Sequence, residues 1–283
     1  MWQFAKYFVQ LSLLFTGKRM LEKCLIPHFR CRIVLFCLIF SGFIGLLSGC
    51  NLYNRTNNSV KNVPVAIIPK ALQRPTIDGV LSEQLWENAV KLDLLVNNGP
   101  NVGKKPNSTT CVALTWDRDN FYLAFVCNDL DISSEFATRD AELWGVGYEK
   151  IEIVELMIIP SIQTTPQYYE MNFNPCGALL DLEVKWIENK PIFNKSWDSN
   201  AKWSVTVNGT LNNCEDTDKN WIVEASLPWK DFNIDARQGM VLRANFFRTD
   251  NSELLRPYFS AWSPTGQPWF HVIERFGILK LGE

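Results

Sequence analysis

Hydrophobic and polar positions alternate through most of the chain after residue 65, and this pattern predicts β-strands. The alternation is clear over 111–116 and 121–126, and the polar run 117–120 between them predicts a tight turn joining two antiparallel strands. Residues 151–159 and 168–175 form a second expected pair. Further strands are expected at four places: 179–186, 203–211, 221–227 and 241–248.

Helical character is confined to one short segment, 82–89, in which Ser82 is the expected N-cap. Many short strands separated by Gly, Pro and Asn are typical of two packed antiparallel sheets. We therefore expect an all-β fold, an antiparallel, jelly-roll-like β-sandwich with a short helix near its start. Four tryptophans lie on strand patterns and are expected in the core: Trp116, Trp186, Trp203 and Trp221.

The C-terminal stretch combines large aromatic residues with three prolines, which interrupt regular strands because proline lacks an N–H donor. Residues 269–277 are expected to form the last strand, with Ile278 and Leu279 packed inward. Trp262 lies in the proline-rich part, where an aromatic side chain is either part of the core or held out for a ligand. We expect Trp262 to be held out for a ligand.

The N-terminus carries an apolar run of 15 residues, 33–47, preceded by Arg30 and Arg32. A membrane-spanning helix needs about 20 apolar residues, so this run is typical of a secretory signal. It ends in Leu-Ser-Gly before Cys50, which resembles the bacterial lipobox and implies lipidation of Cys50. An ordinary anchor helix with a chance cysteine is the alternative.

This pattern predicts three parts of the chain. Residues 1–49 form a signal peptide, with Met20 as an alternative start. Residues 50–64 comprise the lipidated Cys50 and a polar, Asn-rich tether, and residues 65–283 form one folded domain. The expected location is the bacterial cell envelope, where the protein is anchored by its lipid on the periplasmic side or at the cell surface.

Removal of residues 1–50 makes the chain acidic. That segment holds 6 of the 28 Lys and Arg residues and 1 of the 30 Asp and Glu residues, so 22 basic and 29 acidic residues remain, with a net charge of −7. Nucleic-acid binding depends on neutralising phosphates, so no nucleic-acid partner is expected. Contact with a membrane is expected through the lipid alone.

Few residues of the expected mature chain suggest catalysis or metal binding. Its four remaining cysteines form no Cys-x-x-Cys pair; Cys111 and Cys127 flank the expected hairpin, either facing each other or as buried free thiols. His271 is the single histidine after residue 50, and no Gly-x-Ser-x-Gly motif or phosphate-binding glycine motif occurs. A hydrolase with two catalytic glutamates stays open, with Glu149, Glu152, Glu155 and Glu170 as candidates.

Several segments, taken in order, resemble carbohydrate-binding module family 9. The opening Ile-Asp-Gly strand end and Trp-containing helix, the first hairpin, and an Arg-Asp-Ala-Glu-Leu-Trp loop before a Glu-rich strand all fit this family. The matching segments extend over most of the expected domain: 75–89, 114–125, 139–160, 168–177, 227–232, 242–248 and 262–277.

The resemblance implies a non-enzymatic domain that binds an oligosaccharide or polysaccharide. In that family two tryptophans sandwich a terminal sugar, and here the candidates are Trp144 and Trp262. Polar contacts at the rim of the sugar are assigned to the following residues: Arg139, Glu155, Glu170, Asn172, Asn245 and Arg248. Calcium supports loops in the family, and the candidate oxygen donors are Asp129, Asp131 and Asp140.

Three other functions remain as alternatives. Related sandwiches bind haem for electron transfer, which would require His271 with Met157, Met171 or Met240 as axial ligands. The second alternative is the glutamate-dependent glycoside hydrolase. The third is a structural or adhesive lipoprotein whose pocket no longer binds sugar.

Overall fold

The computed structural model describes residues 62–135, 138, 143, 152–162, 167–188, 190–251 and 258–283. The predicted signal peptide, Cys50 and most of the predicted tether lie outside these residues. Within the described part of the chain, no helix is both long and apolar enough to cross a membrane.

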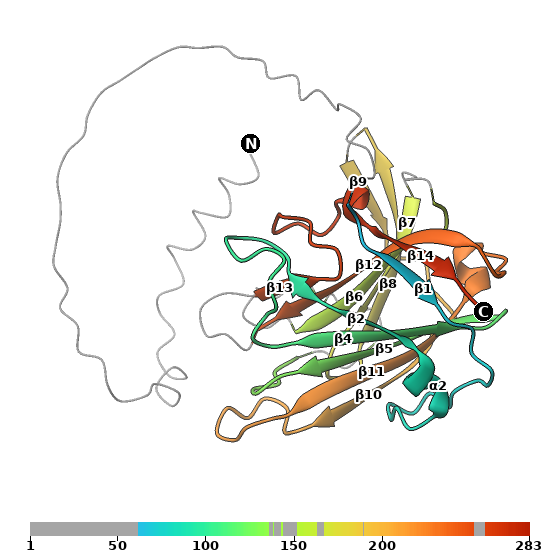
Figure 1. Cartoon of the computed structure of the whole chain (residues 1–283). Coiled ribbons are helices and arrows are strands. Elements are labelled where there is room, and N and C mark those ends of the chain that lie inside the picture. The colour runs from blue at the N-terminus through green and yellow to red at the C-terminus, as the bar shows by residue number, and fades with distance from the viewer. Residues whose placement is uncertain are drawn as a thin grey trace, which may run out of the picture. The chain divides into compact units, whose positions relative to one another are not determined.

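The described residues form two β-sheets (Figure 1). The larger has nine strands: β1 (Val65–Ile68), β3 (Leu95–Val96), β6 (Ile153–Ile159), β7 (Gln167–Phe173), β8 (Leu179–Ile187), β9 (Lys190–Asn194), β12 (Val241–Asp250), β13 (Tyr258–Ala261) and β14 (Gly277–Leu281). The smaller has five: β2 (Val90–Asp93), β4 (Thr110–Trp116), β5 (Asn120–Asn128), β10 (Lys202–Asn208) and β11 (Asn220–Pro228). Neighbouring strands are antiparallel, except that β1 runs parallel to β14.

The core lies between the two sheets, as expected for a β-sandwich. Alternate residues of β5 and β11 from the smaller sheet pack against alternate residues of β6 and β12 from the larger sheet. Every second residue of a strand points to the same face, so Val154 and Leu156 enter this core while Ile153 and Glu155 point to the other face of the larger sheet. The predicted all-β sandwich is therefore confirmed.

The predicted first hairpin is the β4–β5 pair. The Asp117 carboxylate stabilises its turn by accepting hydrogen bonds from the backbone N–H groups of Asp119 and Asn120, both at 2.7 Å. Cys111 pairs with Val126, whereas Cys127 pairs with Thr110. The two cysteines are therefore not opposite each other, and both are free thiols.

A buried glutamate on β11 organises the segment between β1 and helix α2 (Gln84–Asn88). Glu224 accepts hydrogen bonds from the backbone N–H groups of Asp78 and Gly79 and from the indole N–H of Trp86, at 2.8–3.0 Å. These contacts explain the Ile-Asp-Gly and helical Trp pattern of the sequence. The helix is shorter than predicted and begins after Glu83, so the predicted Ser82 cap is wrong.

The C-terminal prediction needs a correction. Residues 269–276 form an irregular segment with the short 3₁₀ helix η3 (Ile273–Arg275), and the last strand, β14, starts only at Gly277. Leu279 is fully buried as predicted, but Ile278 is only half-buried. Consecutive residues of a strand point to opposite faces, so the two side chains cannot both point inward.

The strand tryptophans divide into two groups. Trp116 and Trp221 are buried in the core as predicted. Trp203 is half-buried at the margin of this core, whereas Trp186 is half-buried against the apolar cluster on the other face of the larger sheet. The short strands β1, β2, β3, β9 and β13 were not predicted, because a run of two to five residues carries too little alternation to be recognised.

Candidate binding site

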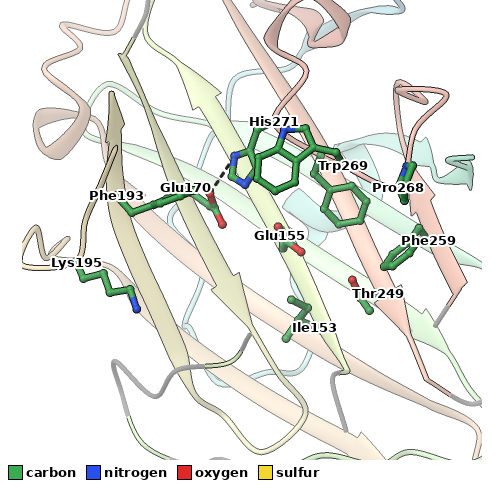
Figure 2. Close-up of a pocket in the computed structure, with 11 residues that line it drawn as sticks. Ile153, Glu155, Glu170, Phe193, Lys195, Thr249, Phe259, Pro268, Trp269 and His271 are labelled. Carbon is green, nitrogen blue, oxygen red and sulfur yellow. Dashed lines mark ion pairs between the residues drawn. The ribbon is translucent and has the colours of Figure 1, made fainter. Parts of the chain in front are cut away.

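A pocket of about 430 Å³ lies on the outer face of the larger sheet, away from the core (Figure 2). Strands β6, β7 and β12 contribute its floor, while β9, β13 and the irregular segment before β14 contribute its walls. The pocket is lined by the following residues: Ile153, Glu155, Glu170, Phe193, Lys195, Thr249, Phe259, Pro268, Trp269, Phe270 and His271.

Strand register brings two of the predicted glutamates together. Glu155 on β6 is paired with Asn172 on β7, and Glu170 lies two residues before Asn172 on the same face. The Asn172 amide donates hydrogen bonds to Glu170 Oε1 at 3.1 Å and to the Leu180 carbonyl at 3.2 Å. Three residues predicted to contact a sugar therefore lie together, Glu155 and Glu170 in the pocket floor and Asn172 beside them, and all are at most 4% exposed.

The two glutamates are held in an environment that disfavours their charge. Burial raises the pKa of Glu170 to about 7, although the Asn172 amide opposes the shift. Burial, and then repulsion from Glu170, raise the pKa of Glu155 well above its ordinary value. Because both charges are so unfavourable here, we expect the pair to retain at least one proton at neutral pH.

His271 lies over Glu170 at the edge of the pocket (Figure 2). Burial lowers the pKa of His271 to about 4, so the ring is neutral at pH 7. The Tyr168 hydroxyl and Nδ1 of His271 share a hydrogen bond of 2.5 Å, and the tautomer of the ring sets which of them donates. Nδ1 also lies 3.8 Å from Glu170 Oε2, which is too far for a hydrogen bond.

Aromatic side chains form much of the pocket wall. Trp269 is 46% exposed, an unusual degree of exposure for tryptophan, and its ring centroid lies 4.5 Å from that of His271. Phe270 is anchored by stacking on Phe247, with centroids 4.3 Å apart, and Phe259 meets Phe270 edge to face. The wall thus presents an accessible indole, Trp269, on a fixed aromatic base.

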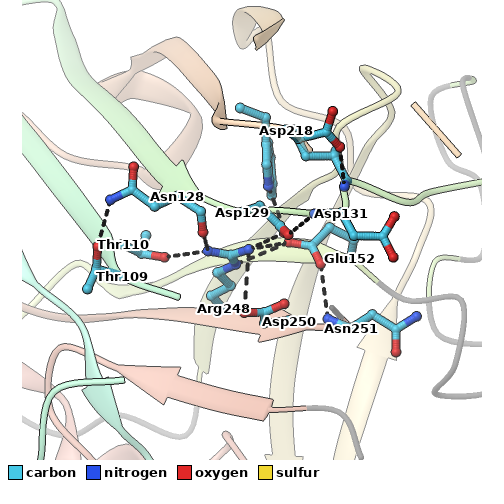
Figure 3. Close-up of polar contacts among 12 residues, drawn as sticks. Thr109, Thr110, Asn128, Asp129, Asp131, Glu152, Asp218, Arg248, Asp250 and Asn251 are labelled. Carbon is cyan, nitrogen blue, oxygen red and sulfur yellow. Dashed lines mark hydrogen bonds and ion pairs between the residues drawn. The ribbon is translucent and has the colours of Figure 1, made fainter. Parts of the chain in front are cut away.

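Arg248, another predicted sugar contact, is instead fully buried in an ion cluster away from this pocket (Figure 3). Its guanidinium lies 2.6 Å from Asp129 Oδ2, 2.9 Å from Glu152 Oε1 and 3.6 Å from Asp250 Oδ2. The assignment of Arg248 to the rim of a sugar is therefore wrong, because these carboxylates occupy its donors inside the fold.

The ion cluster around Arg248 includes Asp129, one of the predicted calcium ligands. Asp129, Glu152 and Asp250 bring carboxylate oxygens within 4.8 Å of one another. Arg248 lies among them, and the other oxygen of Asp129 accepts the backbone N–H of Asp131 at 3.0 Å. Asp129 is thus committed to protein donors, and its surroundings do not fit calcium. Asp140 lies outside the described residues, so calcium elsewhere in these loops stays a prediction.

Trp262, one of the two predicted stacking residues, does not line the pocket. It is 7% exposed, packs edge to face against Phe246 in the core, and its ring lies against the backbone of Gly277. Asn245, also a predicted sugar contact, is fully buried and binds the backbone of Ser263. The interpretation of Trp262 as held out for a ligand is therefore corrected to a core role.

The two remaining predicted sugar contacts, Trp144 and Arg139, lie outside the described residues. Sequence reasoning missed Trp269, Phe193, Phe259 and His271 as pocket residues. Trp269 follows Pro268 in a segment without strand alternation, and this lack of alternation is the sequence signal that favours an irregular segment over the predicted strand.

Comparisons with known proteins agree with this architecture. No curated protein matches the chain. A candidate carbohydrate-binding protein of known structure from Bacteroides uniformis ATCC 8492 aligns with a TM-score of 0.60 at 17% identity, covering 78% of this chain and 100% of that one. A family 9 carbohydrate-binding module from Caldicellulosiruptor kristjanssonii, solved with cellotriose, aligns with a TM-score of 0.51 at 14% identity, covering 77% and 94%. The model of carbohydrate-binding family 9 matches residues 83–281, and the chain therefore belongs to that family.

Proposed function

We propose that this domain binds an oligosaccharide or polysaccharide in the pocket walled by Trp269, without cleaving it. The observation that carries the proposal is an exposed indole beside a floor of buried polar groups, in a chain of carbohydrate-binding family 9. The family 9 module from C. kristjanssonii was solved with cellotriose, and this supports a glycan as the ligand class.

The chemistry of the pocket suits a sugar ring. One face of a pyranose presents C–H groups, which pack on an aromatic ring, while its rim presents hydroxyl groups that need directed partners. Trp269 and Phe259 would supply the apolar contact, and Glu155, Glu170 and Thr249 would supply the polar ones. Stacking by Trp269 replaces the predicted stacking by Trp262, while any contribution of Trp144 stays a prediction.

Isothermal titration calorimetry with cello- and xylo-oligosaccharides tests this proposal. Trp269→Ala should weaken binding at least about tenfold, because it removes the apolar platform. Ile192→Ala is the matched control: Ile192 is 52% exposed on β9, and the adjacent pocket residue Phe193 points to the other face. Equal affinity in Trp269→Ala and wild type would reject this site.

The same samples test the alternative functions. Incubation with the oligosaccharides should leave them intact, whereas shortened products that disappear in Glu155→Gln would favour the hydrolase. A Soret band after haem addition would favour the electron-transfer alternative. Failure of every glycan to bind would favour a structural or adhesive role.

We also propose that the protein is exported and anchored through a lipid on Cys50. The apolar run 33–47 followed by Leu-Ser-Gly-Cys supports this proposal. Mass spectrometry of protein expressed in a bacterial host should find a diacylglyceryl group on Cys50. A Cys50→Ala variant that is still lipidated and membrane-bound would contradict it.

A further inference from the structure

The pocket floor has more hydrogen-bond acceptors than donors. Glu170 Oε2 and Asn172 Oδ1 are both buried, and neither accepts a hydrogen bond from any residue in the described ranges. Glu170 is 1% exposed and lines the pocket, and Asn172 lies beside it with 0% exposure. A buried acceptor without a donor is costly, and the described residues supply no donor for either atom.

The neighbouring His271 does not supply that donor. Its Nδ1 is hydrogen-bonded to the Tyr168 hydroxyl at 2.5 Å, and it lies 3.8 Å from Glu170 Oε2, beyond hydrogen-bond distance. The ring is also neutral at pH 7, because burial lowers its pKa to about 4. His271 therefore presents no positive charge to the glutamates.

Lys195 does not donate a hydrogen bond to these acceptors either. Figure 2 shows Lys195 apart from Glu155 and Glu170, on the Phe193 side of the pocket. None of the described residues therefore supplies a charge that balances the two carboxylates.

An ammonium group meets these requirements better than a hydroxyl group. An ammonium has three donors, no acceptor and a positive charge, whereas a hydroxyl both donates and accepts. The pocket also surrounds its floor with the rings of Trp269, Phe193 and Phe259, and aromatic faces attract cations. Two carboxylates within an aromatic wall therefore favour a cationic ligand.

We propose that the preferred ligand is a sugar with a free, protonated amino group, as in an unacetylated 2-amino-2-deoxy sugar, whose ammonium donates hydrogen bonds to Glu170 and Glu155. This inference rests on the proposed carbohydrate-binding function and names the sugar class. The sugar ring packs on Trp269, and the buried carboxylates distinguish the amino sugar from its neutral and N-acetylated counterparts.

Binding of an amino sugar should also release a proton, which distinguishes it from binding of a neutral sugar. The free glutamate pair retains a proton, and an incoming ammonium favours the fully ionised pair, so that proton leaves to solvent. The measured enthalpy of binding should then depend on the ionisation enthalpy of the buffer. A neutral oligosaccharide should show a much weaker buffer dependence.

The test is calorimetry on the purified protein with three oligosaccharides of equal length: β-1,4-linked glucosamine, N-acetylglucosamine and glucose. At pH 5 the amine of the amino sugar is protonated, since this pH lies well below the pKa of about 7.7–8.0 of an α-amino group. The glucosamine oligomer should then bind at least about tenfold more tightly than either other ligand. Titrations in two buffers of different ionisation enthalpy should show proton release for this ligand.

Variants link the preference to the acid pair. Glu170→Gln should bring the ratio of amino-sugar to neutral-sugar affinity close to one, because it removes a carboxylate that pairs with the ammonium. Glu274→Gln is the control, since Glu274 is exposed on η3 and does not line the pocket; it should keep the wild-type ratio. The buffer comparison uses wild-type protein and stays decisive if Glu170→Gln does not fold.

The outcomes separate this inference from the proposed function. If the glucose oligomer binds as tightly as the glucosamine oligomer, the amino-sugar preference is refuted and carbohydrate binding stands. Tighter binding of the glucosamine oligomer without proton release, and with the same ratio in Glu170→Gln, would also refute the role of the acid pair. If none of the three ligands binds, the proposed function itself fails.

Discussion

Replacing Arg248 by methionine is expected to be among the most damaging single changes to this domain. Arg248 is fully buried, and its guanidinium donates to Asp129, Glu152, the Thr110 hydroxyl and the Asn128 carbonyl at 2.6–3.2 Å (Figure 3). Methionine retains much of the side-chain volume but removes the positive charge and every donor. The substitution therefore isolates the electrostatic contribution of the cluster.

The expected loss of stability follows from the buried carboxylates that remain when Arg248 is replaced. Asp129, Glu152 and Asp250 remain buried with oxygens within 4.8 Å of one another and no cation among them. Removing one partner of a buried ion pair costs about 3–5 kcal/mol, which is a large part of a typical stability of about 5–15 kcal/mol. We expect Arg248→Met to lose about 3–5 kcal/mol at pH 8.

The loss should shrink in acid. Burial raises the pKa of Asp129 to about 6 even with Arg248 opposing the shift, and the pKa rises further when Arg248 is removed. A carboxyl group whose folded pKa exceeds its unfolded value stabilises the fold while protonated and loses that stabilisation as the pH rises through the folded pKa. The variant should therefore approach wild type at pH 5 and fall behind at pH 8.

Urea unfolding followed by tryptophan fluorescence at pH 5 and pH 8 measures both effects. Arg74→Met is the control, because Arg74 pairs with Asp117 and Asp119 at the surface, and such exposed pairs contribute little. We expect Arg74→Met to unfold at nearly the wild-type midpoint. A loss below about 1 kcal/mol in Arg248→Met at pH 8, where burial of the unpaired carboxylates predicts several times more, would refute the reasoning.

Three further predictions concern the fold and its pH dependence. Glu224→Gln should lose about 1–3 kcal/mol in urea unfolding, because an amide N–H₂ then faces donors of the 78–79 turn; unchanged stability would contradict this. Gly277→Ala should lose about 1–3 kcal/mol or more, since the new methyl group would meet the Trp262 ring; thermal unfolding checks it, and an unchanged melting temperature would argue against core packing of Trp262. His271, whose pKa falls from 6.5 to about 4 on folding, stabilises the fold above pH 6.5 and loses that contribution as the pH falls through 4. His271→Asn should flatten this acid loss, and an equally steep loss in the variant would point to other groups.

Local patterns were sufficient for the main strands. The alternation at 111–126 and 151–175 predicted the β4–β5 and β6–β7 pairs, because a half-exposed strand has a period of two that can be read directly. The same rule failed at 269–276, where aromatic residues without alternation belong to an irregular segment. Proline and 3₁₀ geometry decided that segment, and neither produces a periodic signal.

The polar site residues divide in the same way. Glu155, Glu170 and Asn172 were named from ordered motifs, and strand register then brought them to one face. Arg248 also lies in a segment that resembles the family. In the structure, however, it pairs with Asp129 and Glu152, which are far from it in the sequence. Sequence alone could not distinguish a buried ion cluster from a polar contact for a ligand, because both use the same residue types.

The sequence by itself determined the fold class, the family pattern and the set of polar and aromatic residues available for binding. Only the tertiary structure decided which tryptophan is accessible. Trp262 and Trp269 share a proline-rich stretch, yet Trp262 is 7% exposed against Phe246 and Gly277, while Trp269 is 46% exposed at the pocket wall. The physical reason is that the exposure of a side chain depends on which distant strands cover it. The sequence of a short irregular segment does not indicate those contacts.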